Sequence, residues 1–323
     1  MPWRDAMQQA LYGRAGFFTR HAPRDHFRTS ACTSPLFAQA IARLAGSVDQ
    51  AMGDGRFEIV DIGAGRGELL LGIAVNLASD LRKRARFRAV ELAPRPEDLP
   101  QWIDWLAEPP RHVTGLLVAT EWLDNVPLEV VERGEAGEWR QVLVDPATGT
   151  EEVGGPVAPE DAAWLRRWWA EGVRAEPGGP RDAAWAAAVS TLDRGLAVAV
   201  DYGHLAAARP MGGTLTGYRD GRQVAPVPDG SCDLTAHVAV DAVATAGERA
   251  AGRPSQLLDQ RAALRALGVD ATRPPLSLAS EDPGGYVRAL AAATQAAELT
   301  DPYGLGAHYW LTQPVDISVR LEG

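Results

Sequence analysis

Val60-Asp61-Ile62-Gly63-Ala64-Gly65-Arg66-Gly67 is the stretch of sequence that decides the fold. It follows the apolar run Phe57–Val60, which is typical of a buried strand, and it precedes residues 67–81, which have helical spacing. Glycines in such a loop let the backbone turn tightly and approach a ligand closely. The order of strand, glycine-rich loop and helix therefore predicts an α/β fold with a ligand-binding loop. A glycine-rich turn of any α/β protein is the simpler alternative.

The charges around this loop indicate which ligand it binds. The dinucleotide fingerprint needs a third glycine at position 68, where this chain has Glu68. Asp61 would repel a pyrophosphate but tolerates a cation, and S-adenosylmethionine (SAM) carries an ammonium and a sulfonium and no phosphate. Glu91 ends the next strand about 24 residues after Gly67, the distance at which an acid reaches ribose hydroxyls. The predicted cofactor-binding residues here are Asp61, Gly63, Ala64, Gly65, Gly67 and Glu91.

Further strands and helices extend the pattern along the chain. The clearest strands are Phe87–Leu92, Val113–Thr120, Gly195–Val200 and a last one near residues 307–312. Strands that alternate with helices predict a mainly parallel sheet with helices on both faces. Two short runs, Pro127–Val131 and Trp139–Val144, favour a hairpin beside this sheet.

The sequence also predicts how the chain divides. Residues 1–56 are expected to form an N-terminal helical segment that acts as a lid, and residues 57–323 a Rossmann-like domain. Within that domain we expect a helical insertion near 157–193 and a cover of loops and helices near 205–298. The expected helices of these two parts are 160–174, 181–193, 236–247, 254–267 and 281–298.

Composition excludes several classes of function. The formal net charge of −10 disfavours a nucleic-acid partner, because binding phosphates needs a basic face. No apolar run approaches the roughly 18 residues that cross a bilayer. The two cysteines lie far apart and the six histidines show no metal-ligand spacing, so we expect no metal and a cytoplasmic location.

Acidic residues follow two further strands, where an α/β sheet binds its ligands. Glu121 and Asp124 come after Val113–Thr120, and Asp201 ends the strand that begins at Gly195. A pair of carboxylates can orient a guanidinium and localise its charge away from an attacking nitrogen. We therefore predict Glu121 and Asp124 as catalytic residues for a cationic acceptor. The alternative is structural, with Asp124 capping a turn and Glu121 bonding backbone amides.

Several motifs in order give the chain a family resemblance. They are Met7–Gly13, Gly16–Phe18, Phe27–Ser30, Val60–Gly67, Val90–Pro94, Thr120–Pro127, Asp201–His204, Thr214–Leu215, Asp233–Val238 and Leu299–Gly306. With these the chain resembles the MidA-like family of SAM-dependent methyltransferases, which includes the mitochondrial enzyme that helps to assemble respiratory complex I. Two positions depart from the family's N-E-x-x-D-A-L-P signature, since its first asparagine is Thr120 here and its alanine is Asn125.

The resemblance implies a class I methyltransferase fold and further site residues. Thr29 and Ser30 would close over SAM from the N-terminal segment, with a helix-capping role as the alternative. Asn125, Asp201, Tyr202 and His204 would line the acceptor pocket, although a hydrogen-bonded turn accounts equally well for Tyr202 and His204. The implied substrate is a protein arginine, with a respiratory-complex subunit as the candidate partner. A small-molecule acceptor and a SAM-binding assembly factor with little catalysis remain alternatives, and the oligomeric state is left open.

Overall fold

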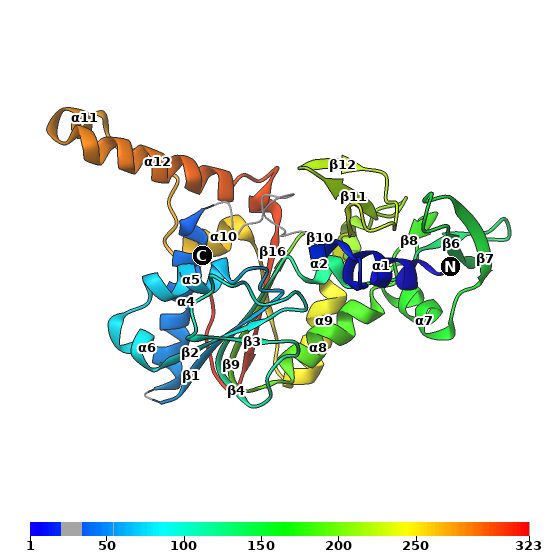
Figure 1. Ribbon diagram of the computed structural model, residues 1–323, viewed down its shortest axis with the longest axis horizontal. Coiled ribbons are helices and arrows are strands. Elements are labelled where there is room, and N and C mark those ends of the chain that lie inside the picture. The colour runs from blue at the N-terminus through cyan, green and yellow to red at the C-terminus, as the bar shows by residue number, and fades with distance from the viewer. Residues whose placement is uncertain (21–33, 54, 323) are drawn as a thin grey trace.

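A computed structural model of the chain describes residues 1–20, 34–53 and 55–322 and is built around one seven-stranded sheet (Figure 1). The strand order is β3-β2-β1-β4-β9-β16-β15. Neighbours from β3 to β9 are parallel, whereas β16 is antiparallel to both β9 and β15. The bounds are β1 Phe57–Ile62, β2 Ala85–Val90, β3 Ile103–Leu106, β4 Val113–Thr120, β9 Leu192–Asp201, β15 Gln256–Asp259 and β16 Tyr309–Val315.

Helices cover both faces of this sheet because its central strands are apolar on both sides. Side chains alternate along β1, so Ile59 belongs to one hydrophobic cluster while Val60 and Ile62 belong to another. The first cluster includes residues of α4 (Pro35–Met52), α5 (Glu68–Asn76), α6 (Ser79–Arg84), α10 (Gln260–Ala266) and α12 (Pro283–Leu299). The second includes residues of α8 (Gly179–Val189) and α9 (Val240–Ala251). The predicted mainly parallel α/β sheet is confirmed.

A second group of elements lies beside the sheet, to the right in Figure 1. An antiparallel sheet has the order β7-β6-β5-β8, a smaller one β12-β11-β13, and β10 pairs with β14. The strands are β5 Val131–Arg133, β6 Trp139–Val144, β7 Glu151–Pro156, β8 Arg174–Ala175, β10 Gly203–His204, β11 Thr216–Arg219, β12 Arg222–Val224, β13 Asp233–Thr235 and β14 Val238–Ala239. The helices here are α1 Trp3–Tyr12, α2 Phe17–Arg20 and α7 Pro159–Trp168. Trp3, Met7 and Leu11 of α1 pack with residues of β6 and β13, so we call this group the side lobe.

The described helices of the N-terminal 56 residues are divided between both parts. Helices α1 and α2 belong to the side lobe, whereas α4 packs against the main sheet. A short helix, α11 (Leu276–Glu281), and α12 extend away from the body at the upper left of Figure 1. Among the helices described, none combines the length and apolar character needed to cross a bilayer.

The predicted helices 181–193, 236–247 and 281–298 are α8, α9 and α12 with shifted bounds, and three other predicted helices differ more. The helix expected over 160–174 ends at Trp168, and Arg174–Ala175 instead pairs with β5. Residues 254–267 begin as strand β15, since this run completes the sheet edge against β16, and only then continue as α10. The segment predicted as one helix over 67–81 forms two helices, α5, which ends at Asn76, and α6, which begins at Ser79. In the first two cases tertiary strand pairing overrides local helical spacing.

Candidate active site

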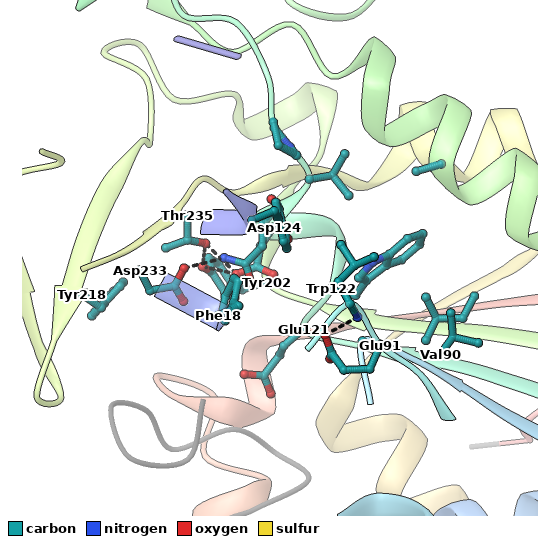
Figure 2. A pocket seen from close by; sticks show the side chains of 18 of the residues that line it. Phe18, Val90, Glu91, Glu121, Trp122, Asp124, Tyr202, Tyr218, Asp233 and Thr235 are labelled. Carbon is teal, nitrogen blue, oxygen red and sulfur yellow. Dashed lines mark hydrogen bonds between the residues drawn. The ribbon is translucent and has the colours of Figure 1, made fainter. Parts of the chain in front are cut away.

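A cavity of about 830 Å³ opens where the carboxyl ends of the central strands meet the side lobe (Figure 2). One half is lined by the ends of β1 and β2, including Ile62, Gly63, Val90 and Glu91. The other half is lined by the segment after β4 and by side-lobe residues. Those residues are Tyr12, Phe18, Glu121, Asp124, Asn125, Tyr202, Tyr218, Asp233, Thr235 and His237. We call the two halves the loop end and the lobe end.

The glycine loop at the loop end has three residues with positive φ. The φ angles are 73° at Gly63, 57° at Gly65 and 85° at Gly67, a region that glycine adopts without strain. A Cβ atom on Gly67 would lie 2.8 Å from Leu99 Cδ1, so this glycine permits close packing. A Cβ on Gly65 would meet no atom nearer than Glu68 Oε2 at 3.9 Å. Space is therefore left open beside Gly65, as a ligand-binding loop requires.

Glu91 is oriented towards this loop by backbone N–H groups. The N–H of Gly65 donates to Oε2 at 3.0 Å, and those of Leu92 and Ala93 donate to Oε1 at 2.7 and 3.0 Å. The carbonyl of Val90 also accepts the N–H of Gly63 at 3.0 Å, which joins the ends of β1 and β2. The carboxylate of Glu91 therefore has a fixed position in the cavity wall, where ribose hydroxyls could bind.

Asp61 is a buried carboxyl at the end of β1, with 3% of its surface exposed. Burial, followed by the nearby carboxylates of Glu91 and Glu68, raises the pKa of Asp61 to about 8. A cation bound at this loop would oppose all three effects. The loop end thus fits a ligand with positive groups and no phosphate, as SAM is. Ala64, the remaining predicted loop residue, is buried.

At the lobe end, Glu121 follows β4 directly and has an unusual backbone. Its φ angle is 51°, in the left-handed region that residues other than glycine rarely adopt. The N–H of Glu121 donates to the carbonyl of Val200 at 2.7 Å, which holds the turn against β9. Strained backbone of this kind costs on the order of 1–3 kcal/mol and clusters at functional sites.

Asp124 lies in a 3-10 turn, Leu123–Asn125, with 4% of its surface exposed. Its Oδ2 accepts hydrogen bonds from the hydroxyls of Tyr202 at 2.7 Å and Thr235 at 2.6 Å (Figure 2). The two hydroxyls also contact each other. The other oxygen, Oδ1, is buried and has no hydrogen-bond partner among the described residues. Asp124 is therefore held from one side, and one acceptor atom is left for a ligand.

Asp201 provides the turn-stabilising role that was the alternative for Asp124. Its Oδ2 accepts the N–H groups of Leu123 at 2.9 Å and Asp124 at 3.2 Å, and its Oδ1 accepts that of Tyr202 at 3.0 Å. The carboxyl is buried and is not among the residues that line the cavity. Its contacts make Asp201 a positioning residue for the turn, and direct substrate contact has no support in this geometry.

Of the predicted acceptor-pocket residues Asn125 and His204, only Asn125 lines the cavity. Its Nδ2 donates to Asp233 Oδ1 at 2.8 Å and to the carbonyl of Leu234 at 3.2 Å. His204 is buried outside the lining, with Nδ1 2.6 Å from the Arg209 guanidinium and its ring 4.7 Å from that of Trp169. Burial, followed by the charge of Arg209, lowers the pKa of His204 to about 3. His204 is thus a neutral packing residue in the structure.

Several lining residues were not predicted from the sequence. The aromatic ones are Tyr12, Phe18, Trp122 and Tyr218, and the polar ones are Asp233, Thr235, His237 and His308. Asp233, Thr235 and His237 stand at alternate positions of one short segment, and this spacing was the available signal. Thr29 and Ser30, predicted to contact SAM, lie outside the described residues.

Comparisons with known proteins agree with this arrangement. Residues 40–257 match the model of a protein family described as "Putative S-adenosyl-L-methionine-dependent methyltransferase". A crystal structure of a superfamily member from Burkholderia thailandensis, bound to S-adenosyl-homocysteine, aligns with a TM-score of 0.80 at 25% identity. The alignment covers 99% of this chain and 89% of that one. A native crystal structure of an uncharacterised protein of the same superfamily and species aligns with the same values. A search of curated proteins gives no match.

Proposed function

The chain belongs to this family of SAM-dependent methyltransferases, and we propose that it transfers the methyl group to a cationic acceptor, the guanidinium of a protein arginine. The family membership gives the reaction class and the cofactor. The acceptor is inferred from the lobe end of the cavity.

One observation carries the proposal: the unpartnered oxygen of Asp124. A buried carboxylate oxygen without a hydrogen-bond donor is costly, so a ligand that brings N–H groups would be favoured there. Glu121 adds a second carboxylate to the same half of the cavity. Among the described residues that line the cavity there is no lysine or arginine to neutralise Asp124. A guanidinium, with five N–H donors and a permanent charge, meets both requirements.

The loop end would hold SAM, which supplies the methyl group when bound. The backbone at Gly63 and Gly65 would lie against the cofactor, and Glu91 would accept hydrogen bonds from its hydroxyls. Asp61 would offset its positive charge. Trp122 connects the two halves, because its indole packs on Gly63 and it also lines the cavity beside Glu121. This contact helps to close the loop end from solvent.

The carboxylates would prepare the acceptor by orienting it. A guanidinium spreads its charge over three nitrogens, so carboxylates bound to two of them would leave the third more electron-rich. The hydroxyls of Tyr202 and Thr235 fix Asp124 for this task. A proton must leave the methylated nitrogen, and the half-buried carboxylate of Glu121 would receive it.

The identity of the protein substrate rests on the resemblance to the MidA-like family. The motifs that carry it support a respiratory-complex subunit as acceptor, while Asn125 in place of the family's alanine alters the pocket wall. Two widely separated cysteines support a reducing compartment, such as the cytoplasm, as the place of reaction. A small-molecule acceptor and a SAM-binding assembly role are the competing functions.

Methyl-labelled SAM tests the proposal directly. The purified protein is incubated with lysate, and label is measured in the protein and small-molecule fractions, followed by analysis of methylated arginine. We expect label on arginine in the protein fraction. Label confined to small molecules would contradict a protein acceptor, and SAM binding without any transfer would favour the assembly role. A Glu121→Gln/Asp124→Asn double variant is the background control.

A further inference from the structure

Within the motif Asp233–Val238 only Thr235 has a role in the function proposed so far, yet the motif forms a wall of the cavity. Leu234 and Ala236 are buried in the hydrophobic cluster that contains Trp3 and Leu11. The residues between and beside them, Asp233, Thr235 and His237, line the cavity. This is the alternation of a β-strand, and β13 covers the first three positions. Packing of the apolar face therefore fixes the polar face towards the ligand.

Asp233 is the charged member of this face, and it is held beside Asp124. Only 5% of its surface is exposed, and its Oδ1 accepts the amide N–H of Asn125 at 2.8 Å. Asn125 follows Asp124 in the 3-10 turn, and Thr235 of β13 donates to Asp124 Oδ2. Two neutral side chains thus tie the two acids together, and Figure 2 shows both acids facing the same part of the cavity.

No lysine or arginine stands beside this wall among the described residues that line the cavity. Burial and the carboxylate of Asp124 raise the pKa of Asp233 well above its usual value. The other groups facing it are the hydroxyl of Tyr12, a donor to the carbonyl of Asn125, and the amide of Asn125, and neither is cationic. A cation bound between the two acids would relieve their repulsion.

Arg181 is the nearby cation, but it stabilises the wall from behind. Its guanidinium is 1% exposed and donates to four backbone carbonyls, those of Asp124, Val126, Ala236 and His237. It is not among the residues that line the cavity. Arg181 therefore fixes the 3-10 turn and the end of the Asp233–Val238 segment relative to each other, without occupying the place of the acceptor.

We propose that Asp233 is a second acceptor-binding carboxylate, which together with Asp124 makes the pocket select a guanidinium over a neutral group of the same shape. The inference rests on the proposed function, since it names a residue that recognises the cationic acceptor. Two carboxylates on different elements can together accept from more of the five guanidinium N–H donors than either could alone.

The test compares an arginine with its neutral isostere. A five-residue peptide with one arginine flanked by glycines, and the same peptide with citrulline, are titrated by calorimetry into protein saturated with S-adenosylhomocysteine. We expect the wild type to bind the arginine peptide at least about tenfold more tightly. Asp233→Asn should weaken binding of the arginine peptide by about 10–100-fold and nearly abolish the preference, with S-adenosylhomocysteine affinity unchanged.

Asp161→Asn is the matched control. Asp161 is another buried carboxyl, in α7, and it pairs with Arg4 at 3.7 Å away from the cavity lining. This variant should keep the wild-type preference. If a melting curve shows that Asp233→Asn does not fold, Asp233→Ser, which can still accept from Asn125, replaces it under the same criteria.

The outcomes separate the two proposals. Equal binding of both peptides by the wild type overturns the cationic acceptor and, with it, the role of Asp233. A wild type that prefers arginine, together with a folded Asp233 variant that keeps this preference, overturns the role of Asp233 alone.

Discussion

The two ends of the cavity are built in opposite ways. At the loop end, one contiguous motif and the end of the neighbouring strand supply the wall, through residues such as Gly63 and Glu91. At the lobe end, side chains arrive from α1, the turn after β4, the end of β9 and β13, which lie far apart in the sequence. Under the proposed function, the first end would recognise its ligand through a local motif with Asp61 and Glu91, and the second through carboxylates brought together by the fold. The following experiments test whether these ends are independent.

Gly65→Val is expected to have the largest effect, on the loop end alone. The new side chain would fill the open space beside the loop and force a β-branched residue to a φ of 57°. SAM affinity should fall by more than about 100-fold, as measured by calorimetry. Gly137→Val is the matched control, because Gly137 also has a positive φ (83°) with open space around it but lies in the β5–β6 turn. Normal SAM binding by folded Gly65→Val would remove the loop assignment.

Removing the charges of the lobe end should slow turnover and spare cofactor binding. Glu121→Gln and Asp124→Asn keep the shape of each side chain, so turnover should fall by about 10²–10⁴ while SAM affinity stays within about threefold. Steady-state kinetics and a melting scan are measured on the same preparations. A lower melting temperature with full turnover in the folded fraction would instead indicate two structural residues.

The pH dependence of SAM binding should come from the loop end. Since the pKa of Asp61 is raised to about 8, the carboxyl is mostly protonated at neutral pH without ligand, whereas a cationic ligand prefers its ionised form. SAM affinity should therefore increase by up to about tenfold per pH unit between pH 6 and pH 8, and level off above. In Asp61→Asn this dependence should disappear. A flat affinity profile in the wild type would show that Asp61 does not titrate on binding.

The same group makes a prediction about stability, with the sign fixed by linkage. The folded-state pKa of Asp61 lies above its unfolded value, so the ligand-free folded protein binds the extra proton. The contribution of Asp61 to the free energy of unfolding is thus complete at low pH and is lost as the pH rises through about 8. SAM should counteract this loss. We expect the increase in melting temperature caused by SAM to grow from pH 6 to pH 8.

The smallest expected effect is that of Tyr202→Phe. It removes one of the two hydroxyl donors to Asp124 Oδ2 while Thr235 keeps the other. The loss of one hydrogen bond to a charged group, about 1.5–3 kcal/mol, predicts a fall in kcat/KM of roughly 10–100-fold, with the lower value expected because Thr235 remains. SAM affinity should not change. A parallel loss of SAM affinity would mean that the two ends of the cavity are coupled through the turn after β4.

Sequence reasoning reached the loop end because its signal is contiguous. A buried strand, three glycines and an acid at the next strand end are all local features, and Val113–Thr120 and Trp139–Val144 were likewise predicted with their observed bounds. Strand β15 was predicted as helix, since only pairing with β16 reveals it. The class I methyltransferase fold is confirmed by the sheet and by the superfamily structure from Burkholderia thailandensis.

At the lobe end, local sequence patterns do not decide which residues line the cavity. Asp124, Asp201 and His204 all lie at or after strand ends, but only Asp124 lines the cavity. The carboxylate of Asp201 accepts hydrogen bonds from backbone N–H groups, and the ring of His204 contacts Arg209. Asp233 reaches the cavity through a strand of the side lobe whose position depends on packing against α1. Whether such a side chain faces the cavity or bonds to a neighbouring residue is decided by the tertiary structure.

The four carbonyl contacts of Arg181 have a consequence for how such an enzyme can change its substrate during evolution. Arg181 connects the wall segments of the lobe end to one another through backbone atoms, which are present whatever side chains those segments carry. Side chains of these segments that face the cavity can therefore be replaced without loss of the hydrogen bonds by which Arg181 connects the segments. The sheet and its glycine loop need not change at the same time. New acceptors can be recruited by side-chain replacement on a scaffold that is already rigid.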